Sequence, residues 1–300
     1  SILISGVNGA IGSFIYNRFF EDYSITGVGY RDNSNKENYF SLDLTKENDV
    51  NTFIEQSKKY DVLIFLVGLA HKKGKNHDLD EFRCVNKKTL TNLLSTLKKY
   101  NILPQKIIFA STISVYGEKI NKYIYDEDSD RDPFSPYAIT KLEAEDYLLD
   151  NFKDQTWILR FAPVYASNFQ LNINRRTKIR GFFYKVGDGS NKLSLCNIEN
   201  ISSVIKNIIE DKVPNGTYNI SDEKDYDYND LLLYVNAKWV VTIPTFLIKW
   251  FYHIGKMMNN IFIKENTIKL ISNNVFPSNK IRKYIVLPYK LNDLSPHKKR

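Results

Sequence analysis

The residues with the clearest potential for chemistry are a tyrosine and a lysine four positions apart. Tyr137 and Lys141 fall in a stretch with helical spacing, so both side chains share one face of the expected helix. A tyrosine titrates near pH ~10, too high for proton transfer at neutral pH, and an ammonium group one turn away lowers that pKa by stabilising the phenolate. The pair therefore indicates a general acid/base, although the same spacing also occurs by chance on solvated helix surfaces.

A hydroxyl group at the end of a buried strand would complete such a site. Residues 106–110 (KIIFA) form a short apolar run that is typical of a buried strand, and Ser111 and Thr112 follow it directly. We therefore expect these hydroxyl groups to lie beside Tyr137.

The first twelve residues (SILISGVNGAIG) have the pattern of a dinucleotide-binding turn. An apolar run leads into Gly6, Gly9 and Gly12, and residues 13–20 continue with helical apolar spacing. Without Cβ atoms, backbone N–H groups can approach a pyrophosphate at the positive N-terminus of a helix. The spacing is G-x-x-G-x-x-G rather than G-x-G-x-x-G, and a purely structural strand-to-helix turn would look the same.

Strand and helix patterns alternate through the first half of the chain. We expect strands at residues 24–30, 39–44, 61–66, 106–110, 157–162 and 216–220, and helices at 46–58, 79–100, 134–151 and 198–211. Such alternation predicts an α/β fold with a doubly wound parallel sheet, the Rossmann type. The rhythm breaks after Tyr165, which predicts a Rossmann domain at 1–166 and a smaller C-terminal substrate-binding domain at 167–300, with segments near 198–220 returning to the first domain.

The ends of the expected strands carry further candidates. Arg31 would favour a 2′-phosphate, as in NADP, whereas the adjacent Asp32 would favour the free ribose of NAD, so cofactor choice stays open with a slight preference for NADPH. His71 lies at the carboxyl end of a buried strand, where doubly wound sheets bind ligands. It could contact the substrate or could be a solvated loop residue.

Composition narrows the class of protein. The 300 residues are 43% hydrophobic and 25% charged, as in a soluble globular protein with an ample core. Two cysteines argue against a disulfide framework, and with no signal peptide before the first strand we expect a cytoplasmic protein. The net charge of +8 is mostly scattered rather than gathered in a basic stripe, so we expect no nucleic-acid partner. We also expect no metal site, and we leave homodimerisation open.

Residues 243–263 (IPTFLIKWFYHIGKMMNNIFI) are the most apolar part of the second half of the chain. Two lysines and a histidine interrupt this segment, and no run of about 20 apolar residues exists, so we expect no stable membrane insertion. A helix of this composition could still lie in a membrane interface. We instead expect one helix at 244–263 that packs within the second domain, with Phe246, Trp250 and Met257 on one packed face.

The order of the motifs resembles the extended short-chain dehydrogenase/reductases, in the branch of nucleotide-sugar epimerases, dehydratases and 4-keto-reductases. The segments that carry the resemblance are GVNGAIG at 6–12, DL at 43–44, LVGLAH at 66–71, VNKKTLTNLL at 85–94, STISVYG at 111–117, SPYAITKLEAE at 135–145, LRFAPVY at 159–165 and GTYNI at 216–220. Each motif alone is weak, but their shared order from residue 1 to about 220 is specific.

The resemblance implies a role for individual residues. Thr112 would polarise the substrate oxygen, Tyr137 would be the acid/base, and Lys141 would support Tyr137 and bind the cofactor ribose. The remaining cofactor contacts would come from Gly6, Gly9, Ile11, Gly12, Arg31, Asp43, Leu44, Ala70, Pro163 and Val164. His71, Thr112 and Asn168 would contact the substrate.

Some positions depart from the family pattern. The second strand lacks the clear terminal acid of NAD-preferring members, and Leu193 stands where many members have an arginine for substrate phosphate. Arg175 and Arg176 could replace it, or could lie on a solvated loop.

The resemblance implies a reductase that acts on the C4 keto group of a UDP-linked, N-acetylated sugar in surface-polysaccharide or O-antigen synthesis. The alternative is a UDP-sugar 4-epimerase with tightly bound NAD, which uses the same catalytic residues. A non-catalytic dinucleotide-binding protein is a more remote alternative, because such proteins commonly lose the tyrosine or the lysine.

Overall fold

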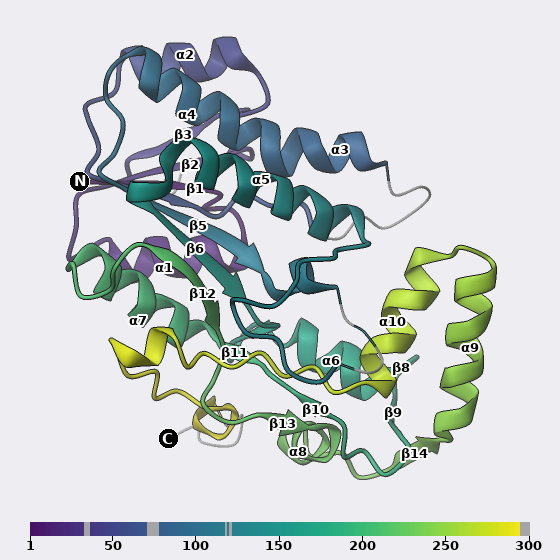
Figure 1. The fold of residues 1–300 in the computed structure, drawn as a ribbon. Helices are drawn as coiled ribbons and strands as arrows, with labels where there is room; N and C mark the ends of the chain where they lie inside the picture. Colours follow the sequence, from purple (N-terminus) through teal and green to yellow (C-terminus); the bar gives the residue numbers. More distant parts are fainter. Residues whose placement is uncertain (33–36, 71–77, 118, 120–121, 295–300) are drawn as a thin grey trace. The chain divides into compact units, whose positions relative to one another are not determined.

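The computed structural model describes residues 1–32, 37–70, 78–117, 119 and 122–294, so His71 lies outside the described residues. The chain divides into two compact units that are interleaved along the sequence (Figure 1). Unit 1 comprises Ser1–Val115, Pro136–Arg160 and Ile205–Thr217, and unit 2 comprises Tyr116–Ser135, Phe161–Val204 and Tyr218–Arg300.

A seven-stranded sheet has the order β12-β6-β5-β4-β1-β2-β3, and most of its residues belong to unit 1. Its strands are β1 (Ile2–Ser5), β2 (Ile25–Gly29), β3 (Tyr39–Ser41), β4 (Val62–Phe65), β5 (Lys106–Thr112), β6 (Thr156–Phe161) and β12 (Gly216–Ile220). The pairings from β3 through β2, β1 and β4 to β5 are all parallel. The order reverses at β1, as in a doubly wound sheet, which confirms the predicted Rossmann architecture.

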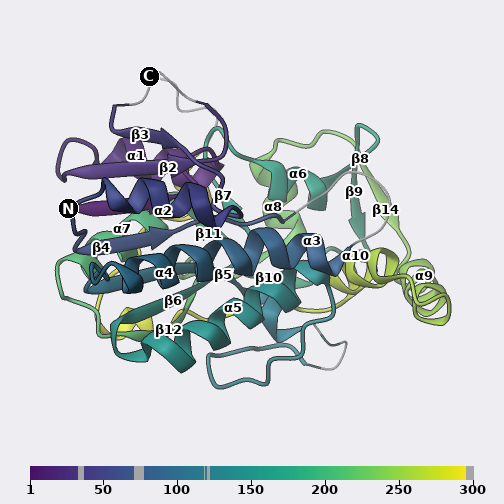
Figure 2. The same ribbon diagram turned by 90° about the horizontal axis from the view of Figure 1, so that it is seen from above.

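Helices cover both faces of this sheet (Figures 1 and 2). On one face lie α2 (Glu47–Glu55), α4 (Thr89–Lys99) and α5 (Pro136–Phe152), and on the other lie α1 (Ala10–Phe19) and the end of α7 (Ile198–Ile209). The strands supply buried side chains such as Leu3, Leu63 and Ile107, which pack with Leu93 and Leu148 from the helices.

The helix expected at residues 79–100 is continuous but irregular. It consists of α3 (Leu79–Arg83), a π-helical turn (Cys84–Lys88) and α4. A π turn inside an α-helix is uncommon and changes the direction of the side chains that follow it, which apolar spacing does not predict.

Unit 2 consists of short elements. The strands are β7 (Val164–Tyr165), β8 (Lys178–Ile179), β9 (Phe182–Val186), β10 (Lys192–Leu193), β11 (Cys196–Asn197), β13 (Tyr226–Asp227) and β14 (Val240–Ile243). The helices are α6 (Leu171–Thr177), α8 (Tyr228–Tyr234), α9 (Thr245–Met257) and α10 (Ile261–Ile271). Among the described residues, 3₁₀ turns lie at Ile281–Lys283 and Leu291–Leu294 in unit 2, at Lys153–Gln155 in unit 1, and at Ile113–Tyr116, where the chain passes from unit 1 to unit 2. The buried carboxylate of Asp222 connects β7 and β13, because it accepts hydrogen bonds from Tyr165 (2.6 Å) and Tyr226 (3.0 Å).

The prediction of one packed helix at residues 244–263 is wrong. Asn259 adopts a left-handed conformation (φ 49°), and the Asn260 side chain caps α10 by accepting a hydrogen bond from the Ile263 N–H (3.0 Å). Two helices therefore replace the expected one. Phe246, Trp250 and Met257 are not packed inside unit 2, since they are 69%, 58% and 87% exposed.

Among the described residues, no helix has the length and the apolar character that crossing a membrane requires.

Candidate active site

Tyr137 and Thr112 meet at the end of β5. Thr112 is the last residue of β5 and is buried, and Tyr137 is the second residue of α5. The two side chains are hydrogen-bonded to each other, and the Thr112 hydroxyl also accepts the Ser114 N–H (3.2 Å). Burial raises the pKa of Tyr137 to about 12, and the Thr112 hydrogen bond acts in the opposite direction. This direction is opposite to the lowering that the tyrosine–lysine spacing predicts, because desolvation outweighs the other effects.

Lys141 lies one turn further along α5 and is buried, with only 2% of its surface exposed. Its Nζ donates hydrogen bonds to the carbonyls of Val67 (2.9 Å) and Ala110 (2.9 Å), so it bridges the chain after β4 and the end of β5. Burial lowers the pKa of Lys141 from 10.5 to about 7, and the Glu145 carboxylate acts in the opposite direction. The amine can therefore change its charge near neutral pH.

The next turn of α5 carries a buried ion pair that the sequence did not single out. Glu145 accepts hydrogen bonds from Arg160 Nε (3.1 Å) and Nη2 (2.7 Å), and also from the Ser111 hydroxyl. Glu145 and Arg160 are 0% and 2% exposed. Because Ser111 lies between Ala110 and Thr112, the pair fixes the end of β5 against α5. The only signal in the sequence was that Glu145 follows Lys141 by four positions, on the same helix face.

Asn86 lies in the π turn and is fully buried. Its side chain accepts the Leu69 N–H (2.6 Å) and donates to Thr140 on α5 (2.9 Å). It thereby holds the segment after β4 beside Lys141. In that segment, a Cβ added to Gly68 would lie 3.3 Å from the Lys141 Nζ.

The glycine turn between β1 and α1 has the close approaches that a dinucleotide site requires. Gly6 has φ 85°, which favours glycine, and a Cβ on Gly12 would lie 2.8 Å from the Gly6 carbonyl carbon. Gly9 is the N-cap of α1 and forms no side-chain cap, and Ile11 is the second residue of the helix. The N–H groups of the first turn are thus not occupied by a capping side chain, and this cradle fits a pyrophosphate.

Asn8 and Tyr39 connect this turn to the end of β2, and neither residue stood out in the sequence. The Asn8 side chain accepts hydrogen bonds from the Arg31 N–H (3.2 Å) and from the Tyr39 hydroxyl (3.2 Å), and Tyr39 also donates to the Arg31 carbonyl. The Arg31 residue itself is exposed.

The predicted adenine and cofactor-backing residues follow β3 and β4. Asp43 is half-buried and accepts hydrogen bonds from the N–H (3.0 Å) and the hydroxyl (2.6 Å) of Thr45. The helix α2 begins at Glu47, one residue later than the expected start, and it has no side-chain cap. Leu44 is buried and Ala70 is exposed.

Three predicted residues belong to unit 2. The carbonyl of Pro163 accepts the Cys196 N–H (3.1 Å), and that of Val164 accepts the Asn172 side chain (2.8 Å). Asn168 is exposed in the tight turn between Ala166 and Phe169.

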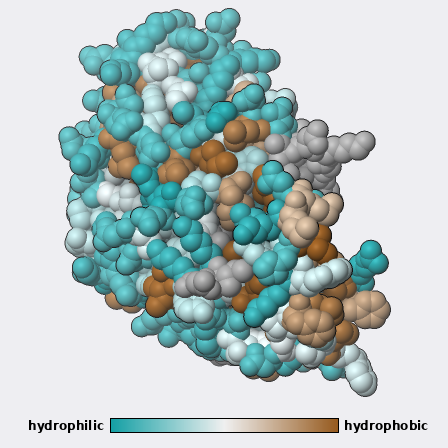
Figure 3. All heavy atoms as spheres, turned by 45° about the vertical axis from the view of Figure 1, so that its right-hand side comes forward, coloured by the Kyte–Doolittle hydropathy of each residue, from teal (hydrophilic) through white to brown (hydrophobic). Residues whose placement is uncertain are grey.

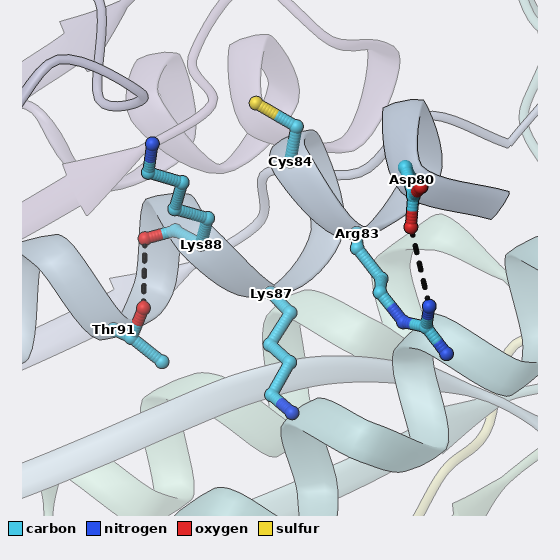
Figure 4. Close-up of a pocket in the computed structure, with 6 residues that line it drawn as sticks. All are labelled: Asp80, Arg83, Cys84, Lys87, Lys88 and Thr91. Atoms are coloured by element: carbon cyan, nitrogen blue, oxygen red, sulfur yellow. Dashed lines mark hydrogen bonds and ion pairs between the residues drawn. The ribbon is translucent and has the colours of Figure 1, made fainter. Parts of the chain in front are cut away.

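A surface hollow lies along the α3–α4 helix, lined by Asp80, Arg83, Cys84, Lys87, Lys88 and Thr91 (Figure 4). Two of its basic groups form ion pairs, because Arg83 pairs with Asp80 (3.3 Å) and with Glu143 on α5 (2.8 Å), and Lys87 also pairs with Glu143 (3.8 Å). The hollow shares no residue with the predicted cofactor or catalytic set.

A doubly wound sheet with a glycine turn between β1 and α1 is the fold of a dinucleotide-binding protein. The sequence profile of the NAD dependent epimerase/dehydratase family matches residues 2–221. The chain belongs to this family, which confirms the resemblance.

Curated relatives include sugar epimerases. An Escherichia coli O157:H7 N-acetyl-alpha-D-glucosaminyl-diphospho-ditrans,octacis-undecaprenol 4-epimerase is 24% identical over 82% of this chain and 74% of that protein. An uncharacterized UDP-glucose epimerase of Bacillus subtilis is 30% identical over 55% of this chain and 57% of that protein.

Solved structures share the fold. A UDP-Glc/GlcNAc 4-epimerase from Campylobacter jejuni has a TM-score of 0.74 at 19% identity, over 98% of this chain and 96% of that chain. The UDP-glucuronic acid 4-epimerase of Bacillus cereus, in complex with NAD, has a TM-score of 0.71 at 18% identity, over 98% and 94% of the two chains.

Proposed function

We propose that this NAD-dependent enzyme epimerises C4 of a sugar that is linked through a diphosphate, with UDP as the carrier. The observation that carries the proposal is the hydrogen-bonded Tyr137–Thr112 pair, one helical turn from the buried Lys141. The named activities of the relatives from Escherichia coli and Campylobacter jejuni support position C4 and the diphosphate linkage.

The cofactor would be held by the residues that the sequence predicts. The first turn of α1, with Gly6, Gly9, Ile11 and Gly12, would bind the pyrophosphate. Asp43 and Leu44 would contact the adenine, Ala70 would back the cofactor, and Pro163 and Val164 would contact the nicotinamide. When bound, NAD supplies the oxidation and reduction at the sugar carbon.

The chain's own side chains handle the proton and the oxygen. Tyr137, with a pKa of about 12, holds its proton at neutral pH and can donate it to a developing alkoxide. In the reverse direction Tyr137 must lose that proton, and a charged Lys141 stabilises the resulting phenolate. Thr112 would hydrogen-bond the substrate oxygen and orient it toward Tyr137, and Asn168 and His71 would contact the rest of the substrate.

A reductase of a 4-keto sugar is the second candidate. It would use the same Thr112, Tyr137 and Lys141. The observation that favours it is the exposed Arg31 at the end of β2, which suits the 2′-phosphate of NADPH, a cofactor that exchanges after each turnover.

Cofactor retention separates the two candidates. We expect the purified protein to release NAD when it is denatured, as detected by mass spectrometry, and to convert UDP-N-acetylglucosamine to its C4 epimer without added cofactor. An empty protein that consumes NADPH in the presence of a 4-keto sugar would contradict the epimerase and support the reductase. Absence of both activities over a panel of diphosphate-linked sugars would contradict both proposals.

A further inference from the structure

Unit 2 exposes apolar side chains on β14 and along one face of α9. Val241, Phe246, Trp250 and Met257 are 56%, 69%, 58% and 87% exposed, and Trp239, directly before β14, is 88% exposed. We call these five side chains the docking face. Apolar atoms gather on the side of unit 2 that carries α9 (Figure 3). Large aromatic side chains seldom gather in water without a partner, so the face indicates an interaction surface.

The docking-face residues of α9 point to solvent, because the opposite side of α9 packs against α10. Ile248 and Gly255 are the buried residues of α9. A Cβ on Gly255 would lie 2.8 Å from Ile263 Cγ2 and 3.0 Å from the Lys264 nitrogen of α10. This close packing of α9 against α10 fixes which residues of α9 face outward.

The chain segment that carries the docking face has charges of one sign. Residues 231–264 contain no aspartate or glutamate, but they contain four lysines and one histidine. Lys249 and Lys256 are exposed on α9 between the apolar residues, and neither forms an ion pair with a described residue. Exposed aromatic residues interspersed with lysines match the interface of a membrane that contains anionic lipid, where rings enter the headgroup region and ammonium groups meet phosphates.

We propose that the docking face binds the surface of an anionic lipid bilayer, with α9 lying in the interface. The proposal does not depend on the proposed function, since it uses no residue of unit 1. A second copy of the chain is the other occupant that an apolar face suits, but the lysines would then face each other across the contact, where they would repel.

The full chain should bind phosphatidylcholine vesicles that contain phosphatidylglycerol, and should bind pure phosphatidylcholine vesicles much more weakly. Flotation with the vesicles measures the binding, and added salt should weaken it. Lys249→Gln/Lys256→Gln and Phe246→Ala/Trp250→Ala should each lower the affinity about tenfold or more. Both variants change exposed side chains, so both should fold.

Matched variants serve as controls. Lys58→Gln/Lys98→Gln removes the same charge from exposed lysines of unit 1, and Tyr284→Ala/Val286→Ala removes apolar side chains of unit 2 that are 48% and 76% exposed. These variants should float like the wild type. If they lose as much binding as the docking-face variants, the attraction is nonspecific and the proposal fails.

Tryptophan fluorescence provides a second measurement on the unaltered protein. Trp157 is buried, whereas Trp239 and Trp250 are exposed, so vesicle binding should shift the emission to the blue and brominated lipids should quench it. No shift and no flotation at low salt would overturn the proposal. A wild-type dimer that ignores vesicles and that Phe246→Ala/Trp250→Ala converts to monomer would instead assign the face to a second copy.

Discussion

Lys141 is the residue whose environment departs furthest from that of an ordinary lysine. Its ammonium is held by two backbone carbonyls, and the glycine at position 68 leaves it covered by backbone rather than by a side chain. Burial disfavours the charged form, which is why its pKa falls from 10.5 to about 7.

This pKa predicts how stability depends on pH. Between about pH 7 and 10.5, the unfolded chain keeps a proton on Lys141 that the folded chain has released, so unfolding takes up a proton. Relative to Lys141→Met, the wild type should therefore gain roughly 1 kcal/mol of unfolding free energy per pH unit as the pH rises from neutrality to about 9. Urea denaturation of both proteins across this range measures the difference. A difference that stays constant with pH would show that Lys141 remains charged in the folded protein.

The sequence predicted that Thr112 and Tyr137 lie together, but it did not predict the contacts that support them. The proximity of Thr112 and Tyr137 could be predicted, because the end of a buried strand and the start of a helix can each be recognised from the neighbouring residues. The Glu145–Arg160 pair and the contacts of Asn86 could not, because these partners meet only when β6 and the π turn pack against α5. The raised pKa of Tyr137 and the lowered pKa of Lys141 were not predicted either, because burial depends on the whole fold.

At the scale of elements, the contact between β1 and α1 positions the predicted cofactor cradle. Gly6 and Gly12 bring the end of β1 against the first turn of α1, and Gly9 leaves the helix N-terminus without a side-chain cap. Gly6 and Gly12 therefore allow close packing, whereas Gly9 leaves the helix N-terminus accessible.

Alanine substitutions should separate these purposes. A Cβ at position 12 would clash with the Gly6 carbonyl and lie 2.9 Å from the Val7 Cα, so Gly12→Ala should lower the unfolding free energy by about 1–3 kcal/mol. A Cβ at position 9 would lie 3.4 Å from the Gly6 oxygen, so Gly9→Ala should fold with near wild-type stability but bind NAD more weakly. Thermal melting and NAD titration of cofactor-free protein test both. Equal stability of the two variants, or unchanged NAD affinity in Gly9→Ala, would contradict this assignment.

Regular elements with a strong apolar pattern were predicted correctly, and irregular ones were not. Apart from β3, the strands of the parallel sheet are short and largely buried runs whose pattern is local. The break between α9 and α10 depends on a left-handed Asn259 and a capping Asn260. The exposed side of α9 was mistaken for a packed one because an apolar pattern does not reveal what covers it.

At the scale of the molecule, the residues proposed for cofactor binding and proton transfer lie mainly in unit 1, and those predicted to bind the substrate lie partly in unit 2. Unit 1 contains the glycine turn, Thr112, Tyr137 and Lys141, so the proposed cofactor cradle and the acid/base lie within one compact unit. Unit 2 contains Pro163, Val164 and Asn168, and its role in binding the substrate is a prediction from the sequence. The chain passes between the units several times, and Ile205–Thr217 belongs to unit 1.

The central claim is that Tyr137 transfers the proton at the sugar oxygen, and the turnover of Tyr137→Phe tests it most directly. The variant keeps the ring but loses the hydroxyl, so we expect it to bind NAD like the wild type while kcat falls at least about 100-fold, equivalent to about 2.7 kcal/mol. Tyr147→Phe is the matched control, because Tyr147 lies on the same helix and packs against Phe152. We expect a kcat near that of the wild type for Tyr147→Phe and a kcat at least about 100-fold lower for Tyr137→Phe. Near wild-type kcat in Tyr137→Phe, with NAD bound, would contradict it.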